Sequence, residues 1–157
     1  MNPYAAPGTV STGVEDDVAA SVPPVLVRVS GGVIALAGAV VGLTGVQTLM
    51  FTMRGPIALA PYLLLGAALP HLVLGVMVFR ARAWAAFAAI GGCFFLSLVS
   101  AAWLVIAISH LLFSLYALLA PVVSVAALVF AFLGLGPCQR ASAARARLRA
   151  QGMDLGV

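Results

Sequence analysis

Few residues of this 157-residue chain could do chemistry, and two of them are spaced symmetrically about Arg82. His71 precedes that arginine by 11 positions, and Cys93 follows it by 11 positions. In a helical hairpin that turns at Arg82, the two side chains would lie at similar depth, with Ser97 one helical turn beyond Cys93. A Cys–His pair could act as a nucleophile with its base, or as half of a metal site.

A structural role is the simpler interpretation of this cluster. Two ligands are too few for a closed zinc site, and no carboxylate is available to orient the imidazole. Pro70 predicts a kink directly before His71, because proline removes a helix hydrogen bond and frees the carbonyl of Gly66. We therefore expect a neutral His71 bonded to Cys93, to Ser97 or to the freed carbonyl, with no catalytic residue, no metal and no cofactor.

The composition indicates where such a cluster would lie. The chain is 64% hydrophobic and 8% charged, with a mean hydropathy of +1.18, whereas a soluble domain carries about 25% charged residues. A chain of this size could not bury so much apolar surface and still cover itself with polar groups. A soluble enzyme, a nucleic-acid-binding domain and a disordered regulator are therefore excluded.

Charge-free stretches define the elements. One separates Arg28 from Arg54 and another separates Arg54 from Arg80, and each fits a single membrane span of about 20 residues. Residues 83–139 are also free of charge and fit two spans, with a turn near Ser109, His110 and Ser114. The sequence predicts an all-α, polytopic four-transmembrane-helix bundle, with helices at about 24–51, 57–79, 84–108 and 113–136.

The arginines predict the orientation of the bundle. An up-down-up-down bundle of four helices has both termini on one side, and with the termini in the cytoplasm only Arg54 lies outside, which the positive-inside rule favours. We expect a multi-pass protein of the plasma (inner) membrane whose cytoplasmic arginines meet anionic lipid headgroups, at about 1 kcal/mol each. These headgroup residues are Arg80, Arg82, Arg140, Arg145, Arg147 and Arg149.

Both ends of the chain differ from the bundle at 23–136. Residues 1–22 are rich in Pro, Gly, Ser, Thr and Ala, which predicts a disordered cytoplasmic tail. Residues 137–157 form a basic cytoplasmic tail, in which alanines and arginines predict a short helix after Pro137.

Small residues mark the faces along which the helices pack. Gly31, Gly38, Gly42 and Gly45 share one helical face, and Gly38–Gly42 is a GxxxG motif. In lipid such faces let helices approach closely, either to close the bundle or to form a dimer, and both roles stay open. A weak repeat at an offset of 60 residues pairs Gly31-Gly32 with Gly91-Gly92, and either duplication or biased composition explains it.

Two function classes follow. The first is a small integral membrane protein that acts through helix packing, without catalysis, as a scaffold, an accessory subunit or a self-associating bundle. Its partners would be the bilayer and a membrane protein or further copies of itself, not nucleic acid. The alternative is a minimal transporter or channel for a small or lipophilic solute, with His71 at a kinked midpoint.

Overall fold

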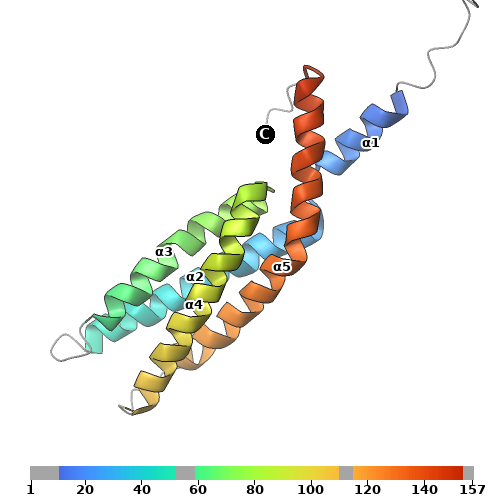
Figure 1. Ribbon diagram of the computed structural model, residues 1–157. Coiled ribbons are helices and arrows are strands. Elements are labelled where there is room, and N and C mark those ends of the chain that lie inside the picture. Colours follow the sequence, from blue (N-terminus) through green and yellow to red (C-terminus); the bar gives the residue numbers. More distant parts are fainter. Residues whose placement is uncertain (1–10, 52–58, 110–114, 154–157) are drawn as a thin grey trace, which may run out of the picture.

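The computed structural model describes residues 11–51, 59–109 and 115–153, which form helices and contain no strand (Figure 1). The helices are α1 (Ser11–Ser21), α2 (Val25–Phe51), α3 (Ala60–Phe79), α4 (Ala83–Ser109) and α5 (Leu115–Ala150).

Four of these helices, α2 to α5, are long and apolar enough to cross a membrane, as predicted. Even α3, the shortest of them with 20 residues, spans about 30 Å at 1.5 Å per residue. Helices α2 and α4 begin and end within one residue of the predicted bounds, whereas α3 begins at Ala60 rather than near residue 57. The expected turn at His110 and Ser114 lies outside the described residues.

The four long helices turn large apolar side chains outward and small ones inward. Leu63 and Phe94 are 64% and 57% exposed, whereas Ala89 and Ala120 are completely buried. Soluble proteins bury large apolar side chains in preference to exposing them. The described helices show the reverse pattern, which suits a bundle surrounded by lipid and held together by close packing.

The long helices form a ring of antiparallel neighbours. Helix α2 packs against α3 and α5, and α4 packs against the other sides of the same two helices. The start of α2 meets the end of α3, where Gly31 lies against Phe79. The second half of α4 meets the first third of α5 at Ser100 and Ser124. Each helix therefore presents its small residues to two neighbours.

The connection between α3 and α4 is a tight turn at Arg80–Arg82. The amide of Arg82 donates to the carbonyl of Met77, and the amide of Ala81 donates to that of Val78, which is the Schellman pattern of a helix C-terminus. Ala81 takes the left-handed conformation there, with φ of 52°, a position that usually holds glycine. Its methyl group is buried, and the turn fixes Arg80 and Arg82 on either side of it.

Both predicted tails contain ordered structure, contrary to the expectation of a disordered N-terminus and a separate C-terminal helix. Residues Ser11–Ser21 form α1, and α5 continues through Pro137 to Ala150, beyond the ends of α3 and α4 (Figure 1). Helix α1 packs against α5. This contact gives both segments a partner that the sequence pattern does not show. Pro137 costs α5 one backbone hydrogen bond but does not end the helix.

Candidate functional site

His71 lies in the interior of the bundle on α3, which runs through Pro70. The side chain is 3% exposed, and Nδ1 lies 2.6 Å from the carbonyl oxygen of Ala67, one turn earlier. A carbonyl oxygen only accepts, so Nδ1 is the donor in this contact. Nε2 is buried without a hydrogen-bond partner among the described residues. The partner of the imidazole is thus Ala67, not Cys93, Ser97 or the carbonyl of Gly66.

Two glycines make room for this imidazole. A Cβ atom at Gly38 on α2 would lie 3.0 Å from the Cβ of His71, and a Cβ atom at Gly92 on α4 would lie 2.9 Å from its Nε2. His71 is therefore packed between α2 and α4, at two positions where a glycine leaves room for the imidazole. Gly92 was not predicted as part of this cluster, although its position beside Cys93 was a usable signal.

The structure brings the neighbourhood of Cys93 to His71 without joining the two side chains. Cys93 is completely buried, and Ser97 donates to the carbonyl of Cys93 at 2.7 Å within α4. No hydrogen bond links His71 to Cys93 or Ser97 in the described chain. The same residues contain no group of three or more His, Cys, Asp or Glu that could hold a metal ion. The arrangement provides neither an activated nucleophile nor a ligand set.

The predicted glycine stripe of α2 faces α3 of the same chain. A Cβ atom at Gly31 would lie 2.6 Å from the carbonyl oxygen of Gly75, and a Cβ atom at Gly45 would lie 3.0 Å from the side chain of Leu65. At Gly42 the nearest atom would be the Cβ of Ala68, at 3.4 Å. The GxxxG face is thus occupied within the bundle. This geometry favours the intramolecular role over dimerisation through the same face.

The 60-residue repeat does not extend to packing. Gly31 and Gly92 lie in close contacts, whereas an added Cβ atom at Gly32 or Gly91 would meet nothing within 4 Å. In the first glycine pair the first residue lies in a close contact, whereas in the second pair the second residue does.

Hydroxyl groups add polar contacts between helices. Ser30 donates its hydroxyl to the carbonyl of Phe130 on α5 at 2.9 Å, with the carbonyl of Leu26 as a second acceptor at 2.8 Å. The hydroxyl groups of Ser100 and Ser124 lie 3.4 Å apart between α4 and α5. Ser30 was missed by the sequence analysis, because a serine beside Gly31 gives no separate periodic signal.

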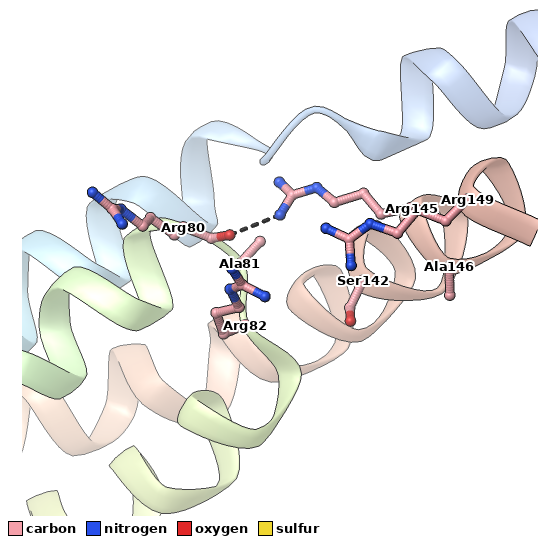
Figure 2. Close-up of a pocket in the computed structure, with 7 residues that line it drawn as sticks. All are labelled: Arg80, Ala81, Arg82, Ser142, Arg145, Ala146 and Arg149. Carbon is pink, nitrogen blue, oxygen red and sulfur yellow. Dashed lines mark hydrogen bonds between the residues drawn. The ribbon is translucent and has the colours of Figure 1, made fainter. Parts of the chain in front are cut away.

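The six arginines predicted at the headgroups fall into different environments. Arg82, Arg145 and Arg149 direct their guanidinium groups toward one another around a cavity of about 420 Å³, whereas the guanidinium of Arg80 points away (Figure 2). Arg145 donates to the carbonyl oxygen of Arg80 at 2.8 Å and to that of Ser21 at 2.9 Å. The remaining two do not line the cavity. Arg147 pairs with Asp17 at 3.3 Å, and Arg140, like Arg82 and Arg149, is exposed.

The arginine cluster is defined by Arg82, Arg145 and Arg149, and the charges of the other two members act on Arg145. Burial lowers the pKa of Arg145, and so do the positive charges of Arg82 and Arg149, although the group stays protonated at neutral pH. Burial also raises the pKa of the nearby Cys138 thiol, an effect that the charge of Arg145 partly opposes.

Comparison with known proteins found no matching family model, no matching curated protein and no matching solved structure.

Proposed function

We propose that this chain is a multi-pass protein of the plasma membrane with both termini in the cytoplasm. The support is the outward-facing apolar surface of α2 to α5, together with the distribution of charge. The turn at Arg80–Arg82 and the C-terminal part of α5 place six arginines at one end of the bundle, and Arg54 belongs to the opposite connection. Exposed Trp84 near the arginine end and exposed Tyr62 near the other suit the two lipid–water interfaces.

Within that membrane, the chain acts through helix packing as a scaffold or accessory subunit, without catalysis. The observation that carries this proposal is that His71 and the glycine stripe are used in contacts inside the chain. The cavity at the arginine cluster and a smaller apolar one on α3 do not include His71 among their lining residues. Self-association, if it occurs, would use the outward faces and not the GxxxG face.

Reporter fusions test the placement. Fusions to either terminus are expected to report the cytoplasm, and a fusion inserted beside Arg54 is expected to report the opposite side. Termini that report the periplasm, or intact protein recovered from cells without detergent, would contradict it.

Transport is the second candidate, and it rests on the buried Nε2 of His71, which has no hydrogen-bond partner among the described residues. A His71→Leu variant separates the two functions, with Trp103→Phe as the matched control, because Trp103 also carries a buried polar atom without a partner. The scaffold proposal predicts altered thermal stability in detergent and no solute flux into liposomes for any of the proteins. Flux that is present in the wild type and the control but lost in a folded His71→Leu variant would favour the transporter.

A further inference from the structure

The arginine cluster is built from segments distant in sequence. Its cavity of about 420 Å³ is lined by the α3–α4 turn (Arg80, Ala81 and Arg82) and by one face of α5 (Ser142, Arg145, Ala146 and Arg149) (Figure 2). Small-molecule sites have volumes of about 300–1,000 Å³, so the cavity is large enough for a ligand. It exists only because α5 continues past Pro137 and lies beside the turn.

Among the residues that the structure describes, no carboxylate lines this cavity to balance its positive charge. The acidic residues that the structure describes, Glu15, Asp16 and Asp17, belong to α1, where Asp17 pairs with Arg147. In the described chain the side chains of Arg82 and Arg149 make no hydrogen bond or ion pair. Arg145 is half-buried, whereas Arg82 and Arg149 are exposed. Like charges that converge repel each other, and an anion placed among them would reduce that repulsion.

The cluster is also partly pre-organised. Two backbone carbonyls, those of Ser21 and Arg80, hold the guanidinium of Arg145 through its Nε and Nη1 atoms. The planar guanidinium fork matches the oxygen geometry of a phosphate and binds it through paired hydrogen bonds. Arg82 and Arg149 keep their donors available, and Ser142 adds a hydroxyl to the lining.

We propose that this cavity binds a phosphate group, carried either by an anionic lipid headgroup or by a soluble phosphate compound. Arg82 and Arg149 contact the phosphate oxygens, and Arg145 supplies a fixed positive charge beside them. The lipid source rests on the proposed placement in the membrane, which sets the cavity at the level of the cytoplasmic headgroups. The soluble source needs no such placement.

Two arms of one experiment distinguish the sources. The full-length protein is reconstituted in phosphatidylcholine nanodiscs and titrated with inorganic phosphate at constant ionic strength. In the other arm, phosphatidic acid replaces part of the phosphatidylcholine and no soluble phosphate is present. Native mass spectrometry counts bound ligand, and the thermal midpoint gives an apparent affinity. Saturable binding in at least one arm is expected, and the arm in which it occurs identifies the source.

The decisive comparison is between Arg149→Gln and Arg140→Gln. Both substitutions remove one positive charge from α5, but Arg140 does not line the cavity. Arg149→Gln is expected to weaken binding about tenfold, since a hydrogen bond to a charged group contributes about 1.5 kcal/mol or more. Arg140→Gln should change binding by less than about twofold. Ser142→Leu keeps every charge but narrows the cavity and removes the lining hydroxyl, so it too should weaken binding.

Two results would overturn the inference. Equal losses in Arg149→Gln and Arg140→Gln, with Ser142→Leu unaffected, would mean diffuse attraction of anions to a basic helix. Absence of saturable binding in both arms by a folded wild-type protein would mean that no site exists. Either result leaves the reporter-fusion test untouched, so the membrane placement stands or falls separately.

Discussion

The inside of the bundle and its arginine end meet opposite physical demands. Between α2 and α3, uncharged backbones touch at Gly31 and Gly75, and an added methyl group would have no space. Around Arg82 and Arg149, space remains and like charges face one another without a lining carboxylate. The first region is fully packed, whereas the second has both the space and the positive charge to accept an anion. The proposed ligand site is therefore separate from the glycine contacts that hold α2 against α3.

The largest effect is expected where backbones touch. Gly31→Ala places a Cβ atom 2.6 Å from the carbonyl oxygen of Gly75 and 2.6 Å from the amide nitrogen of Phe79. Because both atoms belong to the backbone, α2 and α3 must separate, and we expect a loss of about 3 kcal/mol in the free energy of unfolding. Thermal and denaturant unfolding in detergent measure it.

Gly32→Ala is the matched control for that substitution. Its added Cβ atom meets nothing within 4 Å, and alanine favours helix over glycine by about 0.5–1 kcal/mol. Equal destabilisation by the two neighbouring substitutions would contradict the packing of α2 on α3.

A smaller effect is expected at the imidazole. Gly92→Ala sets a Cβ atom 2.9 Å from Nε2 of His71, so the ring must shift, at a cost of about 1–2 kcal/mol. In a double-mutant cycle, Gly92→Ala should cost less in a His71→Ala background, because the clash is then removed. Gly91→Ala, which meets nothing within 4 Å, serves as the control. Additive effects in the cycle would mean that Gly92 and His71 do not touch.

The hydroxyl contact between α2 and α5 comes next. Ser30→Ala removes the bond to Phe130 and should lower unfolding stability by about 0.6–1.7 kcal/mol, the range for such bonds inside membranes. Ser97→Ala removes only a bond within α4 and is expected to cost less. Stability measurements on both variants in the same detergent decide whether the bond between helices matters more.

The smallest effect is expected at the ion pair of Asp17 and Arg147. The pair is 3.3 Å apart and the arginine side chain is 69% exposed, and exposed pairs contribute about 0.2–1 kcal/mol. A double-mutant cycle of Asp17→Asn and Arg147→Gln should give a coupling near the low end of that range, declining with salt. Arg147→Gln should also leave phosphate binding nearly unchanged, since Arg147 does not line the cavity. A large loss of binding in this variant would contradict the proposal that phosphate binds at the arginine cluster and not along the rest of α5.

Composition and periodicity were enough to predict the all-helical fold, the four long apolar helices and the face of α2 that carries its glycines. These features repeat along the chain, because a span needs a fixed length of apolar residues and a close contact needs small residues at helical spacing. The positions of His71 and Gly31 within their helices follow from that spacing. Which atoms lie opposite them does not.

Only the tertiary structure decided what each of these residues contacts. His71 bonds Ala67 and meets Gly92 instead of Cys93, because the rotation of α4 about its own axis is set by packing on both of its neighbours. Likewise, α1 is helical and α5 continues past Pro137 to Ala150, and the two helices pack against each other. The convergence of Arg82 with Arg145 and Arg149 depends on that same extension. Contacts between residues far apart in sequence leave no period in the chain, so the sequence does not predict them.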